Sequence, residues 1–153
     1  MLSLYNPANY NIMVVSDKKK FLTRYGEFFR DCGYNVYSAR CSFECAHSYF
    51  EGGVRIDLVV LDDDMWRSSA VVKDIMEWDN YADILVLGSE KRVSDDACDT
   101  ILEGCAYDHY LSKDDNIGEV LKAASSMLRN KIVKYVTLAD VVQSKPEEVL
   151  ANA

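Results

Sequence analysis

Hydrophobic and polar residues follow two different periods along this chain, one typical of strands and one typical of helices. Short, mostly apolar runs occupy residues 11–15, 34–39, 57–61, 84–87 and 107–111. Between these runs lie longer segments whose apolar residues recur every three or four positions, the period of a helix with one buried face. The pattern predicts five strands, each followed by a helix.

Five such strand-then-helix units predict an α/β fold with a doubly wound parallel sheet and helices on both of its faces. The aliphatic run that ends at Leu61 fits a central strand, because parallel strands covered on both sides read as continuous apolar runs. Residues 107–111 are polar enough to lie at an edge of the sheet. The units span residues 11–130, so we expect an N-terminal extension at 1–10 and a helical extension or linker at 131–153.

Composition removes several classes of function. A net charge of −8 gives the chain no bulk electrostatic reason to bind nucleic acid. No run approaches the roughly 18 apolar residues of a membrane helix, and the N-terminus does not read as a signal peptide. The five cysteines contain no C-x-x-C pair. We therefore expect a cytoplasmic protein with no membrane partner.

Cys41 and Cys45, with His47 nearby, could in principle form a metal site. Residues four apart share a face of a helix, but His47 falls on another face. The spacing favours small residues on a half-buried helix over a metal site.

Polar residues directly follow four of the predicted strands. These are Ser16–Asp17, Asp62–Asp63–Asp64, Gly88–Ser89 and Ser112–Lys113. In open parallel sheets, ligands bind at the carboxyl ends of the strands. Carboxylates gathered there repel one another and favour a hard cation such as Mg²⁺. A carboxylate beside the cation can attack phosphorus, and a lysine can neutralise the transferred group.

In their order and spacing these residues resemble the receiver domain of two-component response regulators. The resemblance covers about residues 11–130 and includes the five-unit alternation, the Ser16–Asp17 pair, the aliphatic run ending at Asp62, and the YLSK of Tyr110–Lys113. It implies a flavodoxin-like sheet with strand order 2-1-3-4-5.

The resemblance also implies roles for particular residues. Asp62 would accept a phosphoryl group from a histidine kinase or phosphotransfer protein. Asp17, Asp62 and the backbone carbonyl of Asp64 would bind Mg²⁺. Lys113 would contact the phosphoryl group, and Tyr110 would be the switch aromatic. The chain would then be a signalling domain rather than an enzyme.

Its partner surface would be the face of the fourth helix, fifth strand and fifth helix. Residues 131–153 would serve as a linker to an output domain or as a homodimer contact. We expect that the chain is a piece of a longer regulator.

Four positions depart from the family pattern: Trp66 and Asp114 stand where the family has proline, and Ser16 and Gly88 affect the site itself. Ser16 stands where the family has an acidic residue, which should weaken Mg²⁺ binding. Gly88 stands at the switch Ser/Thr position, and Ser89 substitutes only if the chain turns at Gly88. A lost hydrogen bond to the charged phosphoryl group costs about 1.5–3 kcal/mol, so phosphorylation would signal poorly.

Several readings stay open. A pseudo-receiver would have this fold and bind proteins without phosphorylation. A phosphohydrolase of the haloacid-dehalogenase type would use Asp62 as nucleophile and Asp64 as general acid/base. Asp17 could instead cap the first helix. Asp63 should point away from Asp62, as a solvated or helix-facing charge.

Overall fold

The computed structural model describes residues 5–79, 82–88, 110–113 and 116–144, with side chains up to residue 130. Its strands are β1 (Asn11–Val15), β2 (Asn35–Ala39), β3 (Leu58–Asp62), β4 (Ile84–Gly88) and β5 (Tyr110–Ser112). Its helices are η1 (Pro7–Asn9), α1 (Lys19–Asp31), α2 (Ser42–Phe50), α3 (Ser68–Trp78) and α5 (Ile117–Ser144). The helix expected between the fourth and fifth strands, and Ser89, lie outside the described residues.

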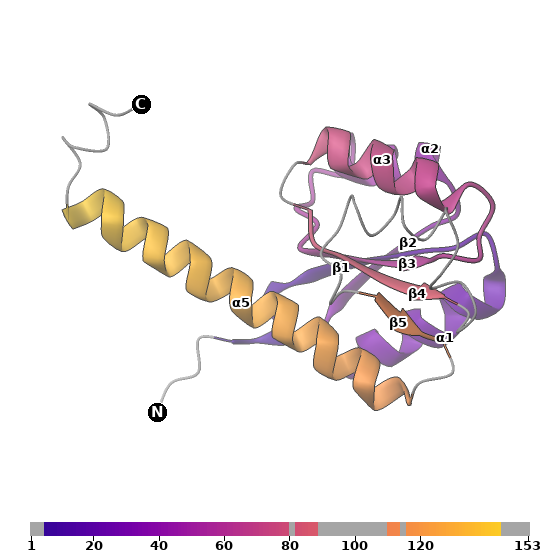
Figure 1. Ribbon diagram of the computed structural model, residues 1–153, viewed down its shortest axis with the longest axis horizontal. Coiled ribbons are helices and arrows are strands. Elements are labelled where there is room, and N and C mark those ends of the chain that lie inside the picture. Colours follow the sequence, from indigo (N-terminus) through magenta and orange to yellow (C-terminus); the bar gives the residue numbers. More distant parts are fainter. Residues whose placement is uncertain (1–4, 80–81, 89–109, 114–115, 145–153) are drawn as a thin grey trace.

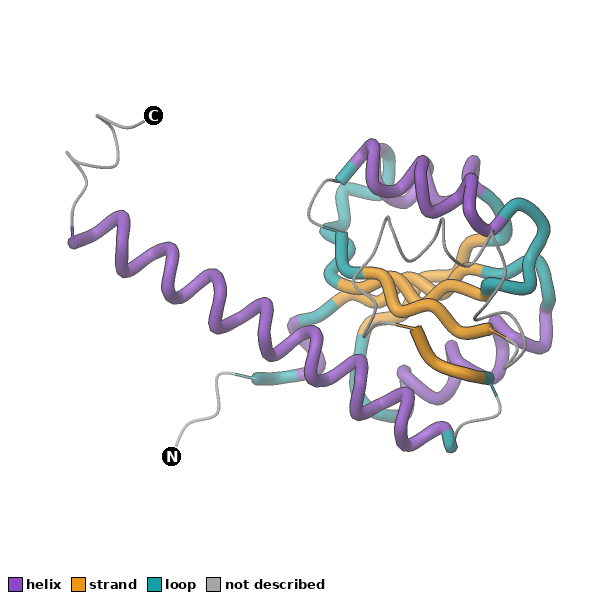
Figure 2. The backbone as a smooth tube through the Cα atoms, viewed as in Figure 1, coloured by secondary structure: helices purple, strands orange, loops and turns teal. Residues whose placement is uncertain are grey.

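All five strands are parallel and lie in the order β2-β1-β3-β4-β5. Figure 2 shows the strands in orange, between the helices. The doubly wound α/β fold and the order 2-1-3-4-5 are therefore confirmed. The register pairs Val15 with Leu61, and Asp62 with Leu87. The carboxyl ends of β1, β3 and β4 consequently meet at one edge of the sheet.

Helices cover both faces of this sheet, α2 and α3 on one side and α1 and α5 on the other (Figure 1). Alternate residues of each strand pack on opposite faces of the sheet, because successive side chains of a strand point in opposite directions. Val14 and Val60 pack with Phe29 of α1 and Leu128 of α5. The strand residues on the other side of the sheet pack with α2 and α3. They are chiefly Met13, Val15, Val59 and Leu61.

β3 is buried along its whole length, which explains its continuous aliphatic run. Full burial of one aliphatic side chain stabilises the fold by about 1.5–3 kcal/mol. The burial does not stop at Leu61 but includes the carboxylate of Asp62, which is 0% exposed. A buried carboxylate is costly unless it is paired and hydrogen-bonded, so the end of β3 needs polar partners.

Both ends of the chain add contacts or length to the five-unit core. Tyr5 stacks on Tyr10, hydrogen-bonds the hydroxyl of Tyr34, and lies under the guanidinium of Arg129 at 4.7 Å. Helix α5 runs on to Ser144 and projects beyond the body of the fold (Figure 1). In the part of the chain that the structure describes, no helix combines the length and apolar character needed to cross a membrane.

The two cysteines at the start of α2 differ in environment. Cys41 is exposed, whereas Cys45 is buried, and burial raises the pKa of the Cys45 thiol to about 12. The ring of His47 pairs with Glu51 at 2.5 Å on the exposed side of the helix. The three side chains therefore have different surroundings.

Iodoacetamide should alkylate Cys41 and leave Cys45 unmodified in the folded protein at neutral pH. The thiolate is the reactive form, and Cys45 is both inaccessible and protonated. Peptide mass spectrometry after a short labelling time measures the two sites. Labelling in denaturant is the control, since both should then react, and equal labelling in the folded protein would contradict the packing of α2.

Candidate functional site

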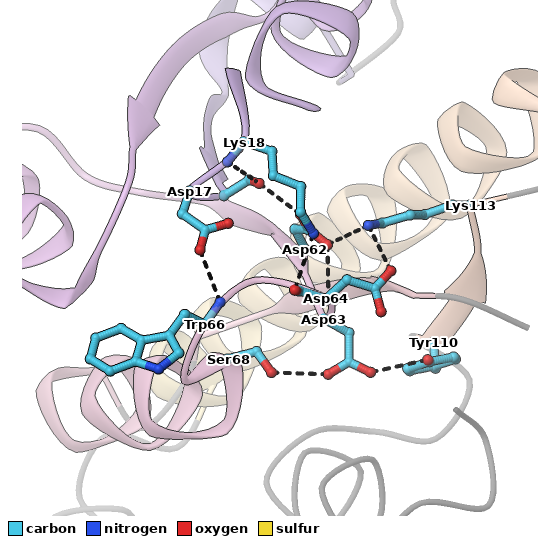
Figure 3. Close-up of polar contacts among 10 residues, drawn as sticks. Asp17, Lys18, Asp62, Asp63, Asp64, Trp66, Ser68, Tyr110 and Lys113 are labelled. Carbon is cyan, nitrogen blue, oxygen red and sulfur yellow. Dashed lines mark hydrogen bonds and ion pairs between the residues drawn. The ribbon is translucent and has the colours of Figure 1, made fainter. Parts of the chain in front are cut away.

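The carboxylate of Asp62 is surrounded by hydrogen-bond donors from three segments of the chain (Figure 3). Its Oδ1 lies 2.6 Å from Nζ of Lys113 and accepts a hydrogen bond from the backbone N–H of Asp64 at 2.9 Å. Its Oδ2 accepts a hydrogen bond from Oγ of Ser16 at 2.7 Å and lies 3.8 Å from Nζ of Lys18. Asp62 is therefore buried as a paired and hydrogen-bonded charge.

Lys113, just beyond β5, joins two carboxylates. Its ammonium lies 2.6 Å from Asp62 and 2.8 Å from Oδ2 of Asp64, and 5.4 Å from the ring centroid of Phe21. Burial lowers the pKa of Lys113, but its hydrogen bonds to the two aspartates outweigh that effect, so the pKa lies above its usual value. Lys113 is therefore a fixed positive charge at neutral pH.

Lys18 is a second cation at this site. Its ammonium donates a hydrogen bond to the backbone carbonyl of Asp64 at 3.1 Å, in addition to its contact with Asp62. Sequence reasoning missed this residue because Lys18, Lys19 and Lys20 look like one solvated charge run. Its position could have identified it as a site residue, because Lys18 directly follows Asp17 in the loop after β1.

Ser16 and Asp17 point to different partners. Besides donating to Asp62, Oγ of Ser16 accepts a hydrogen bond from the backbone N–H of Lys18 at 3.0 Å. Oδ2 of Asp17 accepts one from the backbone N–H of Trp66 at 3.0 Å, across to the loop after β3 (Figure 3). Asp17 does not cap α1, because the N-cap residue of that helix is Lys18.

The three Mg²⁺ ligands that the resemblance implies stay a prediction, and each of them already has another partner in this structure. Lys18 is hydrogen-bonded to the carbonyl of Asp64 and faces the Asp62 carboxylate, and Asp17 is engaged with Trp66. Magnesium needs near-ideal octahedral coordination by oxygen, whereas an ammonium lies against two of the expected ligands. Among the described residues, no group of three or more His, Cys, Asp and Glu is placed to hold a metal ion.

Asp63 lies on the opposite side of β3 and forms a second polar cluster. It is 0% exposed, and its carboxylate accepts hydrogen bonds from Oγ of Ser68 at 3.1 Å and from the hydroxyl of Tyr110 at 3.2 Å. Of the two environments expected for Asp63, the helix-facing one is therefore observed, since Ser68 begins α3. It is not a solvated charge, because α3 and Tyr110 cover it.

Gly88 provides the space that Tyr110 occupies. A Cβ at residue 88 would lie 2.1 Å from the hydroxyl oxygen of Tyr110, 3.0 Å from its Cζ and 3.1 Å from Cβ of Asp63. The aromatic side chain thus passes directly over the backbone of β4 to reach Asp63. The roles of Gly88, Ser89 and Tyr110 in switching stay predictions, and Ser89 lies outside the described residues.

Comparisons with known proteins give likenesses in structure only. No protein-family model matches the chain, and no curated protein matches it. A response regulator receiver domain protein from Clostridium thermocellum superposes with a TM-score of 0.69 at 21% identity, covering 81% of this chain and 98% of that one.

Two further receiver structures agree with the first. A receiver domain protein from Methanospirillum hungatei gives a TM-score of 0.70 at 15% identity, covering 82% of this chain and 98% of that chain. The response regulator TrrA from Thermotoga maritima, in complex with Mg²⁺-BeF, gives 0.65 at 22% identity over 78% of this chain and 99% of that one. This chain therefore has the fold of response-regulator receiver domains, with flavodoxin-like topology.

Proposed function

We propose that this chain is a receiver domain of a two-component phosphorelay and that Asp62 accepts the phosphoryl group. One observation carries the proposal: Oδ1 of Asp62, at the carboxyl end of a central strand, is held 2.6 Å from the ammonium of Lys113. A fold without chemistry at this edge gains nothing from burying a carboxylate and a lysine together, because replacing such a pair by apolar residues is often neutral or stabilising.

The transfer needs few parts from this chain. An oxygen of the Asp62 carboxylate attacks phosphorus of a phosphohistidine or an acyl phosphate, and the bond from phosphorus to the donor nitrogen or oxygen breaks. The electron pair of that bond leaves with the imidazole or the carboxylate. Lys113 is placed to neutralise charge on the transferred group. Because the carboxylate of Asp62 is fully buried, the side chains that cover it must shift to admit the donor.

The partners follow from the same role. A histidine kinase or phosphotransfer protein would supply the phosphoryl group, which adds about −1.5 to −2 of charge. That charge would act first on Lys113, which connects the site to β5. The output or partner surface would then be the face that includes β5 and α5, and the part of α5 beyond residue 130 would be a linker to an output domain or a homodimer contact.

Wild-type protein incubated with acetyl phosphate should gain one phosphoryl group on Asp62, and Asp62→Asn should gain none. Intact mass spectrometry measures the gain, and hydroxylamine should remove it because the product is an acyl phosphate. The matched control is Asp63→Asn, which changes the neighbouring buried carboxylate on the other side of β3 and should keep phosphorylation.

The proposal would be contradicted if wild-type protein gained no phosphoryl group from acetyl phosphate and none from donors that carry a phosphorylated histidine. Turnover of p-nitrophenyl phosphate that is lost in both Asp62→Asn and Asp64→Asn would instead identify a phosphohydrolase.

A second candidate is a protein-interaction module that is never phosphorylated. Two observations favour it: both oxygens of Asp62 already have partners, and Tyr110 is already hydrogen-bonded inward to Asp63 over Gly88. Under this alternative, Asp62→Asn binds the module's protein partner as tightly as wild type does. Under the phosphoacceptor proposal, binding responds to acetyl phosphate in wild type only.

A further inference from the structure

We propose that Lys18 is the resident cation of the Asp62 site and stands where a receiver domain would hold a divalent metal. The resemblance implies metal binding by Asp62 and by the backbone carbonyl of Asp64, and the ammonium of Lys18 approaches these same two groups. It lies 3.1 Å from the carbonyl oxygen of Asp64 and 3.8 Å from Oδ2 of Asp62. The protein would thus hold a positive charge at this position without magnesium.

The rest of the site is consistent with a single positive charge at this place. Ser16 contributes a neutral hydroxyl that donates to Asp62, where a carboxylate would have added a negative charge. Asp17 gives its Oδ2 to the backbone N–H of Trp66. The ammonium of Lys113 contacts the carboxylates of Asp62 and Asp64, and the ammonium of Lys18 contacts the Asp62 carboxylate and the Asp64 carbonyl. A divalent ion would bring two more positive charges beside those ammonium groups, and like charges repel.

The backbone of Lys18 is held at the site as well as its side chain. Its N–H donates to Oγ of Ser16 at 3.0 Å, and the same hydroxyl donates to Asp62 at 2.7 Å. Lys18 is the N-cap residue of α1, with extended backbone (φ −104°, ψ 121°), and the helix begins only at the next residue. The side chain therefore leaves from the β1–α1 loop, while Lys19 and Lys20 line a separate surface hollow with Thr23 and Arg24.

The side chain of Lys18 is 52% exposed, so removing it changes the charge of the site without emptying the core. Magnesium binding can therefore be measured on folded variants by thermal unfolding. A ligand that binds the native state stabilises it by RT ln(1 + [L]/Kd). The variants are Lys18→Ala, Lys18→Met, which keeps the apolar stem, and Lys20→Ala, a matched lysine deletion on α1 outside the site.

Magnesium chloride should raise the melting temperature of wild type and of Lys20→Ala no more than sodium chloride at equal ionic strength does. Lys18→Ala and Lys18→Met should show an added magnesium-specific rise, with Kd at least tenfold tighter than that of wild type. Equal magnesium affinity in wild type and Lys18→Ala would overturn the proposal. A lack of magnesium binding in both Lys18 variants would also overturn the proposal. Ser16 and Asp17 would then explain why wild type does not bind magnesium, without any role for Lys18.

A second arm rests on the proposed function. If Asp62 accepts a phosphoryl group, wild type should be modified by acetyl phosphate at the same rate in EDTA as in magnesium, and Lys18→Ala should require magnesium. Modification of wild type only with magnesium would overturn the role of Lys18. No modification of any variant would sink the proposed function, and the melting experiment would still decide the metal question.

Discussion

Gly88→Ala should lower the free energy of unfolding by about 1–3 kcal/mol, the usual cost of forcing an extra methyl group into a packed site. The added Cβ would lie 2.1 Å from the hydroxyl oxygen of Tyr110 and 3.1 Å from Cβ of Asp63. Atoms cannot approach so closely, so the tyrosine must leave its place over β4. It would then give up its hydrogen bond to the buried Asp63 carboxylate, and urea unfolding measures the total loss.

Gly26→Ala is the matched control. Gly26 is also buried, but a Cβ there would meet only Nη1 of Arg30 at 3.6 Å and Cγ1 of Val36 at 3.9 Å, which are ordinary contacts. Because Gly26 lies within α1, alanine should stabilise that helix by up to about 1 kcal/mol. The two substitutions of the same kind should therefore change stability in opposite directions.

The position of Tyr110 can be tested separately from stability. Adding Tyr110→Phe to Gly88→Ala removes the atom in closest conflict, so the combined loss should be smaller than the sum of the two single losses. Nitration of Tyr110, followed peptide by peptide, should be slow in wild type and faster in Gly88→Ala. A stable Gly88→Ala protein with Tyr110 still protected would show that residue 88 has more room than the structure gives it.

Lys113→Met should destabilise the protein by about 3 kcal/mol, because breaking one side of a buried ion pair leaves an uncompensated charge. Asp62 is 0% exposed, and Lys113 is its shortest contact at 2.6 Å. This loss of unfolding free energy is at the low end of the range for broken buried ion pairs. Lys113 is itself 25% exposed, and Lys18 would still face Asp62. Lys122→Met on the exposed side of α5 is the control and should change stability little.

The pairing itself is tested by a double-mutant cycle with Asp62→Asn. If Asp62 is the charge that Lys113 compensates, Lys113→Met should cost less in the Asp62→Asn background than in wild type. Part of the loss of stability on Lys113→Met should remain in that background, because Lys113 also pairs with Asp64. Equal costs in both backgrounds would mean that Lys113 stabilises the fold through its other contacts alone.

The pH dependence of this contribution follows from the raised pKa of Lys113. A group whose pKa is higher in the folded state stabilises the protein fully below its unfolded pKa. That contribution is lost only as pH rises through the folded pKa. The difference between wild type and Lys113→Met should therefore be constant across neutral pH and shrink only in strongly alkaline solution.

The sequence by itself predicted the strands and helices that the structure describes, and the edge of the sheet at which Asp62 and Lys113 lie. The four-residue aliphatic run before Asp62 predicted a strand buried on both faces, and the resemblance supplied the sheet order. Parallel strands present their carboxyl ends at one edge, so Asp62 and Lys113 were expected at the same edge once the sheet order was assumed. Strand alternation likewise placed Asp63 on the other side of β3.

Only the tertiary structure decided which side chains meet within that edge. Periodicity does not orient residues in loops, so it could not show that Asp17 turns toward Trp66 or that Lys18, of three consecutive lysines, reaches Asp62 and Asp64. Nor could it show that the absence of a side chain at Gly88 lets Tyr110 bind Asp63. These contacts join segments up to 49 residues apart in the chain, and packing between the strands and helices fixes them.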